Sequence, residues 1–295
     1  MPQAEVDITV DLVRALLTDQ HPDLADLSII PLANGWDNAI FRVGEELTVR
    51  LPRRAMAALL VEHEQRVLPG LATRLPIAIP APVRVGRPAL GYPWRWSLNP
   101  WLPGTVAATT ALADPLAEAQ RLGSFLRALH RPAPADAPPN PYRGHFIGEN
   151  TPIVTERVGA LGGSPGFDAD AVLARWAELV DVAPDTAAPR WIHGDLHAAN
   201  MLVDGGAISA VIDFGDVCAG DPATDLACAW GLFATPQVRD VLRSHAGDID
   251  DATWQRAEAW ALHFAIVYLV HSADNPTMGA IGQRLLDSLL TSSGS

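Results

Sequence analysis

The side chains best suited to chemistry lie between His193 and Gly215, in the stretch H-G-D-L-H-A-A-N-M-L-V-D-G-G-A-I-S-A-V-I-D-F-G. Asp195 comes five residues before Asn200, and Asp213 follows a short apolar segment. A carboxylate at the first position could orient a hydroxyl group and accept its proton. An amide and a second carboxylate could hold Mg²⁺ on nucleotide phosphates. Their order and spacing predict transfer of a phosphoryl group from a nucleotide to an alcohol.

The segment that joins Asn200 to Asp213 has the pattern of a β-hairpin. Residues 201–203 and 207–212 alternate as two strands would, and D-G-G at 204–206 suits a tight turn. Pairing of the strands would bring Asn200 and Asp213 together at one end, where a metal ion could bridge them.

Two histidines flank Asp195 and leave a second interpretation open. His193 is expected to brace the loop, while His197 either touches the substrate or hydrogen-bonds nearby backbone. In an extended strand, however, H-x-D-x-H would place three side chains on one face, where they could bind zinc or a transition metal in a metal-dependent hydrolase. The chain shows no evident second His/carboxylate cluster, and this alternative gives Asn200 and Asp213 no role.

Three further acids follow the metal-binding candidates. Asp221 precedes Pro222 at a predicted helix start and is expected to cap that helix. Asp225 falls in the first turn of that helix, where its negative charge interacts favourably with the helix dipole. It could also brace the catalytic loop. Asp216 lies close enough to Asp213 in sequence to face the substrate.

The elements that must position these residues differ along the chain. The first hundred residues predict a small antiparallel sheet with one helix, 55–68, which Pro69–Gly70 should end within a residue or two. The segment N-P-W-L-P-G (99–104) interrupts all periodicity and is a candidate linker. The expected strands of the sheet are 27–33, 38–43, 46–51, 82–85 and 92–98.

Helices dominate beyond the linker, and the proline-rich segment 131–142 must be an extended loop. We therefore expect a nucleotide-binding lobe at 1–99, a hinge at 100–104 and a catalytic, substrate-binding lobe at 105–295. The expected helices of that lobe are 115–130, 169–180, 223–232, 253–271 and 281–290.

Composition excludes several classes of protein. A formal charge of −13 argues against nucleic acid as a partner, and it suits either a cationic substrate or ordinary acidic solubility. No uninterrupted apolar run is long enough for a membrane span. The N-terminus carries acids where a signal peptide has bases, and two cysteines do not suggest a disulfide framework, so we expect a cytoplasmic protein.

Three motifs resemble the aminoglycoside phosphotransferase family, a branch of the protein-kinase-like fold: H-G-D-L-H-A-A-N (193–200), I-D-F-G-D (212–216) and G-D-P-A-T-D-L (220–226). The resemblance implies an α+β fold of two lobes, with a small antiparallel N-terminal sheet and a larger, mainly helical C-terminal lobe. It also implies a small-molecule kinase that uses Mg²⁺ and ATP or GTP. Asp195 would be its catalytic base, with Asn200 and Asp213 as metal ligands.

The same resemblance assigns substrate contacts. Backbone groups of Pro100, Trp101 and Leu102 would contact the nucleobase, and Arg143 would lie near the acceptor. The acceptor itself would be an aminoglycoside-like or macrolide-like antibiotic, as in antibiotic resistance, or a related metabolite. The loop over the nucleotide phosphates would comprise Asn34, Gly35, Trp36, Asp37 and Asn38.

One position departs from the family pattern. The third strand should present a lysine to the phosphates, but L-T-V-R-L-P-R-R (47–54) aligns Arg50 there, and all 21 basic residues of the chain are arginine. Glu64, or alternatively Glu62, would hold Arg50. Macrolide phosphotransferases have a similar R-x-P-R-R string, which favours a branch feature. The alternative is a catalytically silent nucleotide-binding protein.

Overall fold

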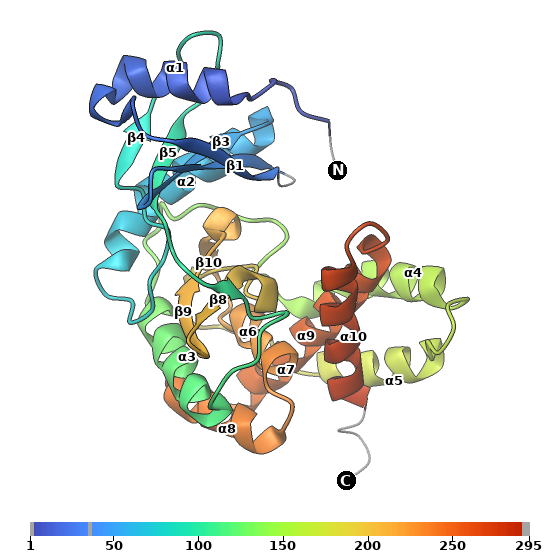
Figure 1. Ribbon diagram of the computed structural model, residues 1–295. Coiled ribbons are helices and arrows are strands. Elements are labelled where there is room, and N and C mark those ends of the chain that lie inside the picture. Colours follow the sequence, from blue (N-terminus) through green and yellow to red (C-terminus); the bar gives the residue numbers. More distant parts are fainter. Residues whose placement is uncertain (1–2, 35–36, 291–295) are drawn as a thin grey trace. The chain divides into compact units, whose positions relative to one another are not determined.

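The computed structural model describes residues 3–34 and 37–290, which form two compact units divided between Leu102 and Pro103. Figure 1 shows the sheet of the first unit and the helices of the second. The α+β fold expected from the sequence is confirmed, with an antiparallel N-terminal sheet and a mainly helical C-terminal part.

The first unit is a five-stranded sheet of order β1-β2-β3-β5-β4, in which all paired strands are antiparallel. Its apolar side chains, among them Phe41, Val49 and Leu98, gather with α1 (Val10–Gln20) in one buried core. Thr9 caps α1, because its hydroxyl accepts a hydrogen bond from the amide of Leu12. The strands are β1 Ile29–Asn34, β2 Asn38–Val43, β3 Leu47–Pro52, β4 Arg84–Gly86 and β5 Trp96–Pro100.

Helix α2 (Ala55–Ala72) begins at the expected residue and ends two residues after Gly70, but it includes Pro69 and so extends four residues past the expected bound at 68. Proline removes one intrahelical hydrogen bond and crowds the preceding turn. The helix nevertheless continues, because Val67, Leu68 and Leu71 are all buried and their packing holds the last turn in place.

The second unit is organised around α9 (Asp251–His271), whose middle is buried on every side. Helices α4, α5, α6 and α10 all contact it. The other helices are α3 Pro115–Leu129, α4 Thr151–Leu161, α5 Ala169–Val180, α6 Ala223–Leu226, α7 Cys228–Leu232, α8 Pro236–His245 and α10 Pro276–Leu290.

Two small sheets in this unit hold the motif residues. Strands β8 (Met201–Asp204) and β9 (Ala207–Val211) form the predicted hairpin, and β6 (Thr105–Val106) adds to its edge. Strands β7 (Arg190–Ile192) and β10 (Cys218–Gly220) pair antiparallel on either side of the motif. Short 3-10 turns lie at Pro22–Leu24, Ile147–Asn150, Ala198–Asn200 and Phe214–Asp216.

Other expected boundaries were wrong in places. The single helix expected over 223–232 is two short helices, α6 and α7, and α10 begins five residues before the expected start at 281. Helices α4 and α8 were not predicted, since α8 buries only Arg239 and Leu242 and so lacks a clear apolar stripe. No helix in the described part of the chain has the length and apolar character needed to cross a membrane.

Candidate active site

The loop that carries Asp195 leaves β7 and turns sharply at Gly194. Gly194 has φ +86°, and a Cβ at this position would stand 2.6 Å from the backbone oxygen of Asp216. A glycine is therefore required here on two counts, backbone conformation and space. The turn places Asp195 next to the 3-10 turn Phe214–Asp216.

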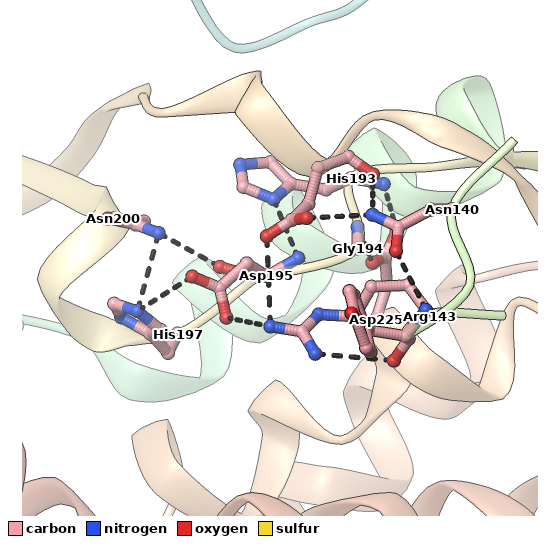
Figure 2. Close-up of polar contacts among 10 residues, drawn as sticks. Asn140, Arg143, His193, Gly194, Asp195, His197, Asn200 and Asp225 are labelled. Carbon is pink, nitrogen blue, oxygen red and sulfur yellow. Dashed lines mark hydrogen bonds and ion pairs between the residues drawn. The ribbon is translucent and has the colours of Figure 1, made fainter. Parts of the chain in front are cut away.

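The Asp225 carboxylate holds the start of this loop through hydrogen bonds to two backbone amides. Its Oδ2 accepts from the amide of His193 at 2.8 Å, and its Oδ1 accepts from the amide of Gly194 at 2.9 Å. The imidazole Nε2 of His130 lies 3.0 Å from Oδ2, and Asp225 is fully buried. Figure 2 shows Asp225 beneath His193 and Gly194. A buried carboxylate with these partners holds the backbone ahead of Asp195 in one conformation.

His193 links the loop to the hairpin. Its Nε2 donates to the backbone oxygen of Ile212 at 3.0 Å, and its Nδ1 accepts from the amide of Asp195 at 3.2 Å. Both ring nitrogens are therefore engaged with backbone, which argues against His193 as a zinc ligand. Among residues 3–34 and 37–290, no three His, Cys, Asp or Glu side chains gather into a metal-binding group.

The side chain of Asp195 meets two basic groups. His197 Nε2 lies 3.4 Å from Oδ2, and Arg143 Nη2 lies 3.5 Å from Oδ1 (Figure 2). His197 Nδ1 accepts from the amide of Ala199, which leaves the Nε2–H to face Asp195. Burial alone would raise the pKa of Asp195, but His197 and Arg143 outweigh it and hold that pKa well below its usual range.

Asn200 and Asp213 offer oxygen atoms that suit Mg²⁺. Asn200 donates its Nδ2 to the backbone oxygen of Asp195 at 2.9 Å, so its amide oxygen points away from that bond. The amide of Ile212 donates to the backbone oxygen of Asn200 at 2.9 Å, which ties the hairpin ends together. Asp213 follows with an exposed side chain and φ +62°. One amide and one carboxylate oxygen fit the hard-ligand preference of Mg²⁺.

Asp216 and Asp221 have different surroundings. Asp216 Oδ1 accepts from Asn140 Nδ2 at 2.7 Å, and Arg143 Nη2 lies 3.7 Å from its Oδ2. Asp221 accepts from the amide of Ala223 at the start of α6, in agreement with a capping role. It also accepts from Arg256 Nε at 2.6 Å. Asp216 thus belongs to the surroundings of Asp195, whereas Asp221 ties α6 to α9.

In the first unit, Arg50 is enclosed by regular elements. Its Nη1 donates to Glu64 Oε1 of α2 at 2.8 Å, so Glu64, and not Glu62, is its partner. With the Asn38 amide oriented so that its oxygen faces Arg50, that oxygen accepts from Nε at 3.1 Å and from Nη2 at 2.9 Å. Arg50 and Glu64 are both buried. The guanidinium is therefore held in a fixed orientation on β3.

The remaining nucleotide-site candidates are spread over this unit. Asp37 pairs with Arg54, and Asn34 ends β1, while Gly35 and Trp36 lie outside the described residues. Pro100 ends β5, Leu102 is the last residue of the unit, and the amide of Trp101 donates to the backbone oxygen of Glu46 at 2.6 Å. Because this bond uses the Trp101 N–H, any backbone donor to a nucleobase would have to come from a neighbour.

A row of aromatic side chains along α9 was not predicted as part of the site. Trp260, Phe264 and Tyr268 recur at i, i+4 and i+8, and Phe264 and Tyr268 stack at 5.9 Å. Arg143 Cζ lies 5.3 Å from the Phe264 ring centre, and Tyr268 meets His197 edge-on. The helical spacing of the aromatics was visible, but nothing in the sequence tied it to Asp195.

Comparisons with known proteins show the family and the fold of this chain. The model of the phosphotransferase enzyme family matches residues 28–260. A GDP complex of aminoglycoside 2'-phosphotransferase-IIIa is similar, with a TM-score of 0.69, 18% identity, and coverage of 95% of this chain and 98% of that chain.

Two macrolide kinases are similar as well. Macrolide 2'-phosphotransferase type I has a TM-score of 0.62 at 22% identity, covering 95% of this chain and 98% of that one. The macrolide 2'-phosphotransferase of Brachybacterium faecium has a TM-score of 0.59 at 21% identity, covering 94% and 98%. Because the family model spans most of the sequence, this chain belongs to the phosphotransferase enzyme family.

Proposed function

We propose that this protein transfers the γ-phosphoryl group of ATP or GTP to a hydroxyl group of a small molecule. The observation that carries the proposal is the pairing of Asp195 with Asn200. The Asn200 amide is anchored to the Asp195 backbone and turns its oxygen away, so a base and a metal ligand are held in one loop.

Asp195 has the chemistry of a late proton acceptor. A carboxylate whose pKa is held low cannot deprotonate a free alcohol in advance. It can orient the hydroxyl and take the proton as the new P–O bond forms, since the oxygen becomes more acidic at that stage. Asn200 and Asp213 would hold Mg²⁺, which would neutralise phosphate charge when bound.

The first unit would bind the nucleotide. Arg50, fixed by Glu64 and Asn38, would place its charge against the phosphates as the usual lysine does. The 34–38 loop would cover them, and residues 100–102 would meet the base. The enclosed Arg50–Glu64 pair supports an active enzyme over a silent one, because it keeps the guanidinium oriented.

The acceptor belongs to the second unit, where Asp195 lies. Antibiotics are candidate acceptors because structural neighbours include complexes with kanamycin, gentamicin and streptomycin, as well as macrolide kinases. Hydroxylated metabolites remain candidates on the same chemistry, since function depends on the site and not on the fold.

The test is a coupled ADP- and GDP-release screen against aminoglycosides, macrolides and metabolic alcohols, with Mg²⁺ present. We expect acceptor-dependent nucleotide turnover by the wild type and none by Asp195→Asn. Nucleotide binding without acceptor-dependent turnover across the whole panel would contradict the proposal and favour a silent protein.

A further inference from the structure

Arg143 gives the surroundings of Asp195 a positive charge supplied by the chain itself. We propose that Arg143 is a specificity-determining residue that excludes polycationic acceptors, so that the chain acts on alcohols carrying at most one ammonium group. This inference rests on the proposed function, because it names the acceptor class of the same site.

The geometry places one cation between two acids. Arg143 Nη2 lies 3.5 Å from an oxygen of Asp195 and 3.7 Å from an oxygen of Asp216. An ammonium group of a substrate bound next to the reacting hydroxyl would bind these two carboxylates. With Arg143 in place part of their negative charge is already offset, so a further cation gains less attraction and meets repulsion from the guanidinium.

The guanidinium is held on several sides. Its Cζ lies 5.3 Å from the Phe264 ring centre, and Nη1 donates to the backbone oxygen of Tyr142 at 3.2 Å. Asn140 accepts from the amide of Tyr142 and donates to Asp216, which joins the loop to the second carboxylate. Figure 2 shows the Arg143 side chain directed toward Asp195, with Asn140 on the opposite side of the view from Asp195.

The backbone after Arg143 is fixed as well. Gly144 has φ +70°, and a Cβ there would stand 2.6 Å from Gly220 Cα of β10. Its carbonyl oxygen accepts from the amide of Asp221 at 2.9 Å. The loop therefore packs closely on β10, which fixes the backbone from which the Arg143 side chain extends.

The surroundings of Arg143 on the α9 side are basic or neutral. His263 is buried on α9 beside Trp260 and Phe264. Burial, together with the neighbouring basic side chains Arg157, Arg143 and His145, lowers its pKa to about 3. A neutral imidazole among basic neighbours adds no attraction for ammonium groups.

This local charge runs against that of the whole chain. A formal charge of −13 raises the concentration of cations around the protein, which is why a cationic substrate is compatible with composition. Selection at the site depends on nearby, partly desolvated groups, and Arg143 has only 21% of its side chain exposed. Arg143 therefore has more influence on acceptor choice than distant surface acids.

A matched pair of ligands tests the proposal: kanamycin and its fully N-acetylated form, which keeps the hydroxyls and loses the ammonium charges. Calorimetric titration without nucleotide gives the two affinities for wild type and Arg143→Gln. We expect the wild type to bind kanamycin no better than the acetylated form. Arg143→Gln should gain at least about 10-fold for kanamycin only, and the gain should fall with added salt.

Three further variants make the result specific. Arg143→Lys keeps the charge and should behave as wild type, and Arg127→Gln removes an exposed arginine of α3 and should change neither affinity. Arg143→Leu keeps apolar contact with Phe264 and repeats the test if the glutamine variant does not fold.

Two outcomes overturn the inference: a wild type that prefers kanamycin over the acetylated form, or charge-removing variants with no selective gain for kanamycin. The acceptor screen with nucleotide separates this result from failure of the proposed function. No transfer to any acceptor, together with a selective gain for kanamycin, would reject the kinase activity and leave the selection by Arg143 standing.

Discussion

Arg50 and Arg143 are both guanidinium groups paired with carboxylates, but the chain holds them in different ways. Arg50 projects from β3, and its partners Glu64 and Asn38 come from α2 and β2, so regular elements position all three. Arg143 lies in a loop, and its partners Asp195 and Asp216 lie in loops or turns as well.

Arg50 and Asp195 are therefore held in position by different kinds of interaction. In the first unit the strand register fixes Arg50, so neighbouring side chains need only fill space and balance charge. In the second unit Asp195 lies in the loop after β7 and outside any strand, so individual hydrogen bonds from Asp225, His193 and Asn200 must hold it. Substitutions should therefore have larger effects around Asp195 than around Arg50.

The largest effect is expected from Asp225→Asn. Asparagine has one side-chain oxygen where aspartate has two, so it cannot accept hydrogen bonds from both the His193 and the Gly194 amide as Asp225 does. The substitution also removes the charge beside His130. We expect a loss of about 3–5 kcal/mol in the free energy of unfolding. Urea unfolding measures it, with the exposed Asp204→Asn as the control. A loss below about 1 kcal/mol would mean that the loop has other support.

Next in size is Gly194→Ala, which tests the sharp turn before Asp195. The positive φ and the 2.6 Å approach to the Asp216 backbone should together cost about 2–4 kcal/mol. Gly205→Ala is a matched control, because Gly205 also has a positive φ (+57°) but has nothing within 4 Å of its Cβ position. Equal losses in the two variants would show that the close approach does not matter.

Arg50→Ala tests the group formed by Arg50 and its partners Glu64 and Asn38 in the first unit. Losing a charged hydrogen bond to phosphate should raise the nucleotide KM about 10–100-fold and lower kcat, with little change in the acceptor KM. Arg50→Lys should recover part of the loss. Arg84→Ala, which breaks an exposed pair with Asp23 in the same unit, is the control for steady-state kinetics. Unchanged kinetics in Arg50→Ala would show that another residue holds the phosphates.

The smallest effect concerns pH and His263. Its folded pKa of about 3 lies below the ordinary 6.5, so the unfolded chain binds a proton first as pH falls. This group destabilises the fold progressively below pH 6.5, by about 2 kcal/mol at pH 5. His263→Gln should lose less stability than wild type between pH 7 and pH 5 in urea unfolding.

The control for that comparison is His271→Gln, which removes an exposed histidine from the same helix. Identical pH slopes for wild type and His263→Gln would show that His263 does not remain neutral inside the fold. The effect is smallest because it vanishes at neutral pH, where folded and unfolded chains both hold an uncharged imidazole.

The sequence predicted the local elements well where side-chain pattern alone decides them. Strand 38–43, helix 169–180 and the 201–212 hairpin are confirmed, because alternation, capping and a D-G-G turn act over short distances. Helix α2 runs past Pro69 because tertiary packing overrides a local breaker.

The candidate site divides in the same way. The spacing of Asp195, Asn200 and Asp213 can be read from the sequence, because a single loop and hairpin carry them. Local spacing does not predict the approach of Arg143 to Asp195, since it depends on how the 131–147 loop packs on β10 and α9; only the family resemblance implied that Arg143 lies near the acceptor. Contacts between segments far apart in sequence leave no mark in local spacing.

We propose that Asp195 serves phosphoryl transfer and not nucleotide binding. Single-turnover transfer and Mg-nucleotide affinity, measured together in wild type and Asp195→Asn with the best acceptor from the screen, test this role. We expect Asp195→Asn to transfer phosphate at least about 100-fold more slowly and to bind nucleotide within about 2-fold of wild type. Transfer at the wild-type rate by Asp195→Asn would contradict it.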